Sequence, residues 1–274
     1  MSYEQFFKLT EQPFSTAPDS RFFFDSTPHK EALLKILHAA ETMKGLMIII
    51  GDIGTGKTLL ARRALEEMEK QDQYIVSLLV MVHSEITPDW LLKRIAQQIG
   101  IEKPAGKKEE LLPQFYGRLM EINETGKKAV IVIDEANMLK TKEIFEEFRG
   151  LLNIEMPGKK LLTLILIGMP DLEEHIGLDP AFQQRIAIKH CLKKLDREET
   201  YNYITYRMKV AGAQHEIFSD TALEAIYSYT TGTPRLINII CDNALFEAFL
   251  LKKDKVDLSI IESVASDFNL RKMV

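Results

Sequence analysis

The chain has 274 residues, 46% apolar and 27% charged, and 35 Lys and Arg against 40 Asp and Glu give a formal charge of −5. Such a composition is typical of a soluble globular protein that is long enough to bury its core without disulfides or metals. The mild acidic balance excludes a whole-chain electrostatic footprint for nucleic acid but does not exclude a local basic strip.

The cysteines, the N-terminus and the apolar runs indicate the cellular compartment in which the protein works. Cys191 and Cys241 form no Cys-x-x-Cys pair, and we expect both to be small buried side chains in a reducing environment. The first residues lack the basic stretch and apolar core of a signal peptide. The longest apolar run, residues 161–169, is about half as long as a membrane-spanning helix. We therefore expect a cytoplasmic protein without a membrane span of its own.

The N-terminal part leads into a strand and a loop. Residues 1–27 are rich in Phe and Pro and show no clean period. Thr27-Pro28 marks a helix start, with proline at the first helical position, and Gly45 ends that helix. The apolar run 46–50 lies between two glycines, which favours a buried strand. A Gly-rich loop and a helix over residues 57–71 follow.

Strands and helices then alternate. Further strands are predicted at residues 74–82, 129–133, 161–167 and 186–190. Helices are predicted at residues 87–100 and 142–152, and another ends near residue 124, after a polar loop at 102–110 and with a start that Pro113 obscures. The uninterrupted Leu and Ile content of the fourth strand indicates that both of its faces are covered, as in a parallel sheet. The alternation predicts an α/β layered domain.

After about Leu195 the sequence predicts helices alone, at residues 197–211, 220–230, 235–252 and 257–268. Asp196, with Glu199 three residues later, is typical of a capping box for the first of them. We therefore expect three parts: an N-terminal segment at residues 1–27, an α/β core at residues 28–193 and an all-helical domain at residues 194–274.

The loop after the first strand matches a phosphate-binding motif in full. Its sequence, G-x-x-x-x-G-K-[ST], is Gly51-Asp52-Ile53-Gly54-Thr55-Gly56-Lys57-Thr58. Glycines let the backbone wrap a phosphate closely, successive N–H groups point inward, and the helix N-terminus adds a positive dipole. We expect Lys57 to reach the β- and γ-phosphates and Thr58 to coordinate Mg²⁺, with nucleotide contacts from Gly51 through Leu59. The expected cofactors are ATP and Mg²⁺.

The strand at residues 129–133 runs directly into two carboxylates, Asp134 and Glu135. We expect Asp134 to hold Mg²⁺, directly or through water. Glu135 is the candidate general base, because such a base must lie within hydrogen-bond reach of the attacking water. Taken alone, an acidic pair after a strand is often only a solvated strand end. With a full phosphate-binding loop upstream, the pair predicts a P-loop ATPase.

On further residues the chain resembles the AAA+ ATPases of the general secretion pathway A (ExeA-like) group, which includes relatives from pilus and exopolysaccharide loci. The motifs that carry this resemblance cover nearly the whole chain: Phe6-Phe7-x-Leu9, Pro13-Phe14-Ser15, Pro18-Asp19-x-Arg21-Phe22, His29-x-Glu31-Ala32-Leu33, Asp134-Glu135-Ala136-Asn137, Gln184-Arg185-Ile186, Val210-Ala211-Gly212 and Gly232-Thr233-Pro234-Arg235-Leu236-Ile237-Asn238. The last is fairly specific for this group and its transposition-related relatives. The resemblance implies a P-loop AAA+ parallel sheet flanked by helices, followed by an all-helical lid domain.

The resemblance also implies roles for two arginines. Arg235 matches the sensor-2 arginine of the lid, where a guanidinium grips the γ-phosphate bidentately. Arg185 lies where related ATPases carry an arginine finger that acts across a subunit interface. The structural alternatives are a surface arginine after a turn and a helix-end arginine near carbonyls. We expect residues 1–27 to contribute to the nucleotide pocket, where Phe14 either lines the adenine site or packs in the core.

One position departs from the family pattern. The fourth strand of the family usually ends in Gly-Gln-Pro, whose glutamine serves as sensor 1, but here the residues are Gly168-Met169-Pro170. A thioether is a weak acceptor and no useful donor, so it cannot position the attacking water as an amide does. We expect slow hydrolysis, or that Asn137 or Asn153 has taken over the role.

Three hypotheses for the function follow. In the first, ATP drives homo-oligomerisation and conformational work in secretion or pilus and envelope assembly. Longer relatives continue with a membrane span and a peptidoglycan-binding domain, and the sequence up to Val274 shows neither, so we expect a partner subunit of that machinery to provide any envelope link.

The second hypothesis is an ATP-regulated DNA-binding protein of the transposition target-selector type. Basic clusters at residues 62–63, 103–108, 159–160 and 252–253 favour it, whereas the net charge of −5 weakens it. The third hypothesis is a nucleotide-switched scaffold that hydrolyses ATP slowly, and Met169 motivates it.

Overall fold

The computed structural model describes residues 2–17, 19–82 and 85–272. Pro18, from one of the matching motifs, lies outside the described residues. The chain forms two compact units. The first, here called the α/β unit, comprises Lys30–Ile53 and Leu60–Leu192. The second, the helical unit, comprises Met1–His29, Gly54–Leu59 and Lys193–Val274.

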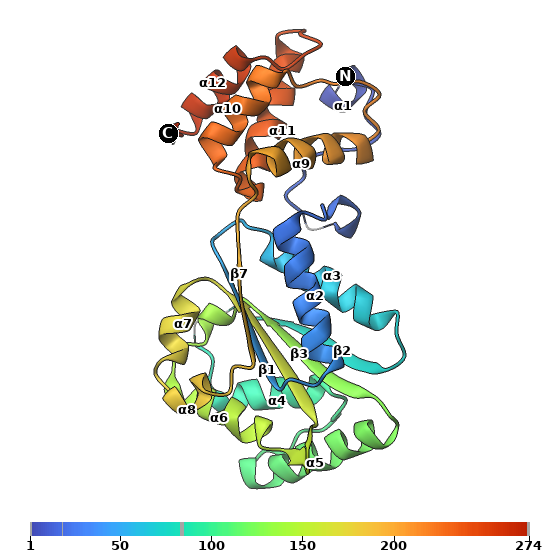
Figure 1. The fold of residues 1–274 in the computed structure, drawn as a ribbon, viewed down its shortest axis with the longest axis vertical. Coiled ribbons are helices and arrows are strands. Elements are labelled where there is room, and N and C mark those ends of the chain that lie inside the picture. The colour runs from blue at the N-terminus through green and yellow to red at the C-terminus, as the bar shows by residue number, and fades with distance from the viewer. Residues whose placement is uncertain (1, 18, 83–84, 273–274) are drawn as a thin grey trace. The chain divides into compact units, whose positions relative to one another are not determined.

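The α/β unit is built on a five-stranded sheet with the strand order β2-β3-β6-β1-β7 (Figure 1). The strands are β1 (Leu46–Gly51), β2 (Tyr74–Val80), β3 (Lys128–Asp134), β6 (Leu162–Gly168) and β7 (Ile188–Leu192). All neighbouring pairs are parallel. The three central strands are buried almost throughout, which accounts for their continuous apolar sequences. The predicted parallel α/β sheet is confirmed.

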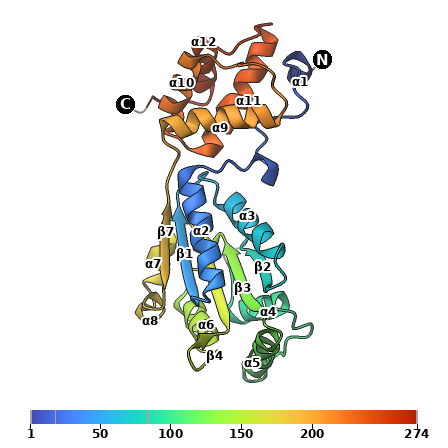
Figure 2. The same ribbon diagram turned by 45° about the vertical axis from the view of Figure 1, so that its right-hand side comes forward.

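Helices cover both faces of this sheet. They are α2 (Thr27–Glu41), α3 (Lys57–Glu69), α4 (Pro88–Gln98), α5 (Lys108–Glu124) and α6 (Lys142–Leu152). Figure 1 and Figure 2 show α2 and α3 over one face and α4, α5 and α6 over the other. On the second face, Ile48, Ile131 and Leu164 share a core with Phe115 and Phe148. A 3-10 turn, η2 (Ala136–Met138), follows β3, and the short helices α7 (Asp171–Ile176) and α8 (Pro180–Gln183) connect β6 to β7.

One local prediction in this unit was wrong. The expected loop at residues 102–110 overlaps α5, which begins at Lys108 and contains Pro113. Pro113 is the sixth residue of this helix and removes one hydrogen bond of its ladder, but Leu111 and Phe115 on its apolar face are fully buried, which stabilises the helix. Residues 155–160, for which the sequence made no prediction, form a short hairpin with strands β4 (Glu155–Met156) and β5 (Lys159–Lys160). Two-residue strands are too short to show a sequence period.

The cysteines differ from each other. Cys241 is buried, as expected, but Cys191 is exposed, so the prediction for Cys191 was wrong. The reason is its position in β7, which lies at the edge of the sheet and alternates between buried and exposed side chains. His190 and Leu192 take the buried positions of this strand, and Cys191 lies between them.

The helical unit follows the predicted pattern. Its helices are α9 (Arg197–Val210), α10 (Asp220–Thr230), α11 (Pro234–Leu250) and α12 (Leu258–Asp267). The predicted capping box is present, because the side chain of Asp196 accepts from the backbone N–H of Glu199 and the Glu199 side chain accepts from that of Asp196. The N-terminal helix α1 (Tyr3–Phe6) and the 3-10 turn η1 (Ser20–Phe22) belong to this unit, and Phe7 and Phe14 share its apolar core.

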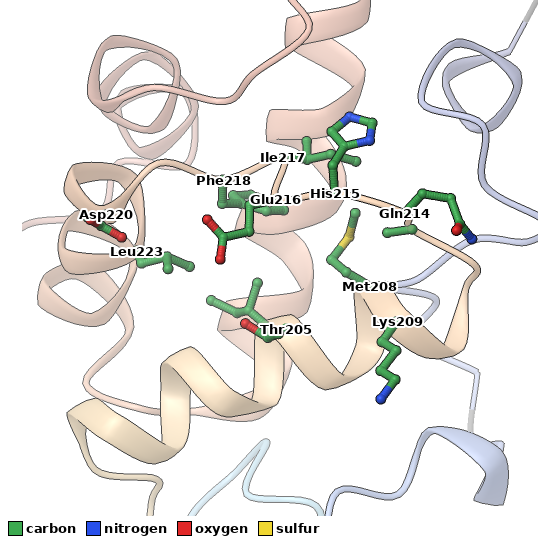
Figure 3. Close-up of a pocket in the computed structure, with 12 residues that line it drawn as sticks. Thr205, Met208, Lys209, Gln214, His215, Glu216, Ile217, Phe218, Asp220 and Leu223 are labelled. Atoms are coloured by element: carbon green, nitrogen blue, oxygen red, sulfur yellow. The ribbon is translucent and has the colours of Figure 1, made fainter.

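Within residues 2–17, 19–82 and 85–272, no helix is both long enough and apolar enough to cross a membrane. The helical unit contains a cavity of about 330 Å³ between α9, α10 and the segment before α10 (Figure 3). Ile204, Met208 and Phe218 supply apolar lining, and Glu216 and Asp220 supply carboxylates. Its lining includes none of the residues predicted to bind nucleotide.

Candidate nucleotide-binding site

The carboxyl edge of the sheet gathers three of the predicted motifs. Since β1, β3 and β6 run parallel, their last residues, Gly51, Asp134 and Gly168, lie at the same edge. Gly51 is also the first residue of the phosphate-binding loop, so this loop begins at that edge. Ligands of open parallel sheets bind outside the carboxyl ends of the strands. The sheet topology therefore places the acidic pair and the start of the loop on the side where a ligand binds.

The loop has the backbone geometry of an anion-binding nest. Gly54 and Gly56 have φ values of 78° and 94°, which lie in the left-handed region that glycine adopts without strain. When residues with left-handed and right-handed φ values alternate, as they do here, successive backbone N–H groups point toward one side, where they can surround an anion. Lys57 begins α3 and is only 6% exposed, and Thr58 follows in the first turn. The loop therefore meets the conformational requirement for wrapping a phosphate.

Arg235 lies beside this loop. Its backbone N–H donates a hydrogen bond to the carbonyl oxygen of Gly54 at 3.1 Å. A Cβ atom on Gly54 would lie 2.8 Å from the Cβ of Arg235 and 3.2 Å from Cγ2 of Thr233. The first turn of α11 therefore packs directly against the loop, and only glycine permits this approach. The structure brings the predicted sensor-2 arginine and the loop together.

Asp134 has the properties of a cation ligand. It is fully buried, and its Oδ1 accepts a hydrogen bond of 2.9 Å from the backbone N–H of Glu135. Its Oδ2 is buried too and has no hydrogen-bond partner among the residues that the structure describes. An unsatisfied buried carboxylate oxygen is costly, and a cation or its bound water would satisfy it. Carboxylate and hydroxyl oxygens, such as those of Asp134 and Thr58, are the ligand types that Mg²⁺ prefers. These residues fit the metal.

Glu135 is held in a strained conformation. Its φ and ψ of 54° and 36° are left-handed, which costs a non-glycine residue about 1–2 kcal/mol. Non-glycine residues in this conformation cluster at functional sites, although they also occur elsewhere in this chain, for example at Thr231. The conformation occurs here at the residue that the sequence predicts to be the general base.

Asn137 occupies the polar position next to Met169. It is 2% exposed, and its Oδ1 accepts a hydrogen bond of 3.0 Å from the backbone N–H of Met169. A Cβ on Gly168 would lie 3.0 Å from both the backbone N and the Oδ1 of Asn137, so the glycine is needed for this contact. The structure therefore brings an amide side chain to the end of β6, where the family's glutamine would stand.

Asn153, the alternative candidate, lies elsewhere. It caps the end of α6 and is exposed. The adjacent Leu152 contacts the position of Gly45, which precedes β1, so this region lies at the amino edge of the sheet. The structure contradicts a sensor-1 role for Asn153, because the carboxyl edge is on the opposite side.

Arg185 is also near the amino edge. It follows α8 and precedes β7, is half-buried, and donates its backbone N–H to the carbonyl of Phe182. Its charge acts on Glu155 of the β4–β5 hairpin, whose pKa is lowered mainly by Lys160 and to a smaller extent by Arg185. Because Arg185 precedes a parallel strand, the α/β unit does not bring it to the carboxyl edge of its own sheet. Any role at a phosphate would require a neighbouring subunit.

One contact to the loop was not expected from the sequence. Nε2 of His29 lies 2.8 Å from the carbonyl oxygen of Thr55, in the middle of the loop. The residue belongs to one of the motifs that carry the family resemblance, but that motif assigns it no role. The only local signal was its position just after the Thr27-Pro28 helix start.

The chain is similar to known proteins of one family. Residues 40–176, half of the chain, match the AAA domain family. General secretion pathway protein A of Aeromonas hydrophila is 33% identical over 258 residues, which are 93% of this chain and 46% of that protein. The chain thus spans less than half the length of this curated relative. The similarity confirms the resemblance to the general secretion pathway A group.

Solved structures support the same fold. The ORC2 protein of Aeropyrum pernix, in ADPNP-ADP complexes, is 16% identical with a TM-score of 0.66, over 96% of this chain and 73% of that one. The ORC1 protein of Aeropyrum pernix, in complex with DNA, is 18% identical with a TM-score of 0.67, over 95% of this chain and 70% of that one. At these identities the likeness shows a shared fold alone. With the family match over half of its length, this chain belongs to the AAA domain family.

Proposed function

We propose that this protein is a Mg²⁺-dependent ATPase whose nucleotide cycle drives oligomerisation and conformational work in secretion or in pilus and envelope assembly. The observation that carries the proposal is the buried Oδ2 of Asp134, which has no partner among the described residues and lies at the sheet edge where the P-loop begins. A carboxylate in this position is explained by a cation, and the loop that starts from this edge at Gly51 has the geometry for a phosphate.

The proposed roles follow from the residues. The loop from Gly51 through Leu59 binds the phosphates, and Lys57 contacts their β and γ groups. Thr58 and Asp134 hold the metal, which when bound neutralises charge on those groups. Glu135 accepts a proton from the attacking water. Arg235 senses the γ-phosphate.

Two further residues complete the proposed site. Asn137 orients the attacking water in place of the family's glutamine, because its side chain is fixed by the N–H of Met169 at the end of β6. Arg185 acts from a neighbouring subunit. This assignment agrees with its place before β7, away from the carboxyl edge of its own sheet. ATP-dependent association of subunits would then complete the catalytic site.

The biological process is inferred from the relative. General secretion pathway protein A shares 33% identity over 93% of this chain, which supports a partner in a secretion or envelope machinery. The conformational work would be passed to that partner.

The experiment compares the wild-type protein with Lys57→Ala in a titration with a fluorescent ATP analogue, with Mg²⁺ and with EDTA. We expect wild-type binding that weakens in EDTA and a loss of at least about tenfold in the variant, equivalent to about 1.4 kcal/mol. Arg62→Ala is the matched control, because Arg62 is exposed on the same helix. A folded wild-type protein that binds no nucleotide would overturn the proposal. Light scattering with and without the analogue tests oligomerisation separately.

DNA binding receives less support. In the basic clusters, Arg63 pairs with Glu67, Lys108 with Glu147, Lys160 with Glu155 and Lys253 with Asp257. Lysines and arginines that are paired with carboxylates offer less charge to a phosphate backbone. Anisotropy of a labelled duplex at about physiological salt, with and without nucleotide, tests this alternative. Nucleotide-dependent binding at sub-micromolar protein would favour it over the envelope role.

A further inference from the structure

His29, in the first turn of α2, contacts the P-loop from within the helical unit. It is 6% exposed, its Nε2 lies 2.8 Å from the carbonyl oxygen of Thr55, and its Nδ1 lies 2.7 Å from Oγ of Ser26. A carbonyl oxygen can only accept, so Nε2 must carry the proton. The hydroxyl of Ser26 then donates to Nδ1 and accepts from the backbone N–H of His29 at 3.4 Å. Both ring nitrogens are thereby satisfied in one tautomer.

The ring has little freedom to leave this position. It forms a T-shaped pair with the Phe23 ring, at a centroid distance of 5.9 Å and an interplanar angle of 88°. On the loop side, a Cβ on Gly56 would lie 2.8 Å from Nε2, so only glycine leaves room for the imidazole. Burial lowers the pKa of His29, and the hydrogen bond to Thr55 and the carboxylates of Glu199 and Asp25 oppose this effect. A neutral ring suits the observed pair of hydrogen bonds.

This hydrogen bond has a geometric consequence for phosphate binding. The carbonyl of Thr55 and the N–H of Gly56 belong to the same peptide group, which is planar and trans. They therefore point in opposite directions, so a donor that holds the carbonyl on one side directs the N–H to the other. Without that donor, the peptide could rotate and present a carbonyl oxygen, which repels an anion, where the nest requires an N–H.

We propose that His29 is a positioning residue that fixes the Thr55–Gly56 peptide of the P-loop before nucleotide binds, and thereby sets the affinity for the nucleotide's phosphates. The effect on affinity rests on the proposed function. The effect on the loop does not, since it concerns the protein without nucleotide.

Two substitutions separate the hydrogen bond from packing. In His29→Gln the side-chain amide NH₂ lies about where Nε2 stands and can donate to the Thr55 carbonyl. In His29→Asn the shorter amide reaches only the position of Nδ1. Both remove the aromatic ring, so a role in packing alone would affect them alike. His38→Asn is the matched control, because His38 is an exposed histidine of the same helix.

The measurements are hydrogen–deuterium exchange of the peptide covering residues 52–60 without nucleotide, and the dissociation constant for ADP. We expect faster loop exchange and about tenfold weaker ADP binding in His29→Asn, and values within about threefold of wild type in His29→Gln and His38→Asn. Thermal unfolding of each variant shows whether the chain is folded. Circular dichroism checks its helix content.

Each result bears on the proposal. If His29→Gln and His29→Asn change loop exchange equally, or if neither changes it, the positioning role is overturned. If loop exchange separates the two variants but wild type binds no ADP, the ATPase proposal fails and the positioning of the loop stands. If wild type binds ADP and both variants bind it equally well, the positioning role fails and the ATPase proposal stands.

Discussion

Nε of Arg207 donates a hydrogen bond of 2.6 Å to the carbonyl oxygen of Pro13. The same guanidinium donates to the carbonyl of Ser15 at 3.2 Å and to the hydroxyl of Tyr203 at 3.0 Å. That hydroxyl donates in turn to Oδ1 of Asn238 at 2.8 Å. A buried arginine therefore connects the N-terminal segment, α9 and α11. The network also gives a structural role to Asn238, the last residue of the motif that contains Arg235.

Arg207→Met should destabilise the helical unit by about 3 kcal/mol, because it removes charge-assisted hydrogen bonds and leaves two backbone carbonyls without their donor. Urea denaturation followed by circular dichroism measures the change. Lys209→Met, an exposed position of the same helix, should change stability by less than about 0.5 kcal/mol. Equal midpoints for the two variants would show that the network adds no stability.

Glu135→Gln should lower ATP turnover by about 10²–10⁴-fold, because the amide cannot accept a proton from the attacking water. ATP affinity should stay within about threefold of wild type, since the change preserves shape. Phosphate release under saturating ATP and a separate binding titration provide the two values. A variant that retains wild-type turnover would exclude Glu135 as the base.

Met169→Gln should raise turnover severalfold if the thioether limits hydrolysis, because the amide restores a donor and an acceptor at the end of β6. Asn137→Ala should lower turnover of the wild-type chain and also release the N–H of Met169. The double variant Asn137→Ala/Met169→Gln tests whether Asn137 has taken over the role of the family's glutamine. If it has, the glutamine at position 169 should recover part of the turnover that Asn137→Ala loses. An unchanged rate in Met169→Gln would show that Met169 does not limit hydrolysis.

Gly232→Ala should destabilise the helical unit by about 3 kcal/mol or more. Its φ of 71° is left-handed, and an added Cβ would overlap the carbonyl oxygen of Leu195, which is backbone and cannot rotate away. Gly117→Ala is the contrasting change, since an added Cβ meets nothing within 4 Å there. That substitution, inside α5, should raise stability by about 0.5–1 kcal/mol. Thermal unfolding of both variants tests whether the first lowers and the second raises the stability.

The buried ring of His29 should make stability depend on pH. Its folded-state pKa is lowered from the usual 6.5, so the unfolded chain takes up a proton first as the pH falls. The contribution of His29 to the free energy of unfolding is constant above pH 6.5. It becomes destabilising as the pH drops below 6.5 toward the folded-state pKa. The carboxylates of Asp25 and Glu199 reduce the shift. His29→Gln should therefore lose less stability than wild type between about pH 7.5 and 5.5 in urea titrations. A parallel loss in both proteins would contradict this prediction.

Local patterns predicted the parts of the fold that local forces determine. The apolar strands, the glycine positions of the P-loop and the capping box at Asp196 each depend on neighbours within a few residues. The sequence could not show that β6 lies between β1 and β3, because a hydrophobic run reports burial but does not identify its partner strand. The order of strands is decided by pairing across long separations.

The sequence likewise predicted only the part of the candidate site that local motifs determine. Two motifs predicted roles for Lys57, Asp134 and Glu135, but neither predicted the contact between His29 and Thr55. That contact depends on how the start of α2 packs against the loop, which no period along the chain encodes. The same holds for Arg207, whose carbonyl partners lie nearly 200 positions earlier in the chain. In the sequence, Pro13 and Ser15 were only part of a motif that resembles the family. The structure shows that their carbonyl oxygens accept hydrogen bonds from Arg207.

The chain passes between the two compact units after His29, after Ile53, after Leu59 and after Leu192. No single cut can therefore release either unit with all of its parts. A fragment beginning at Lys193 would lack the N-terminal residues, such as Phe7 and Phe14, that share the core of the helical bundle. The two units are consequently not modules that one recombination event could exchange between relatives, and a graft that keeps the bundle folded must bring the beginning of the chain with it.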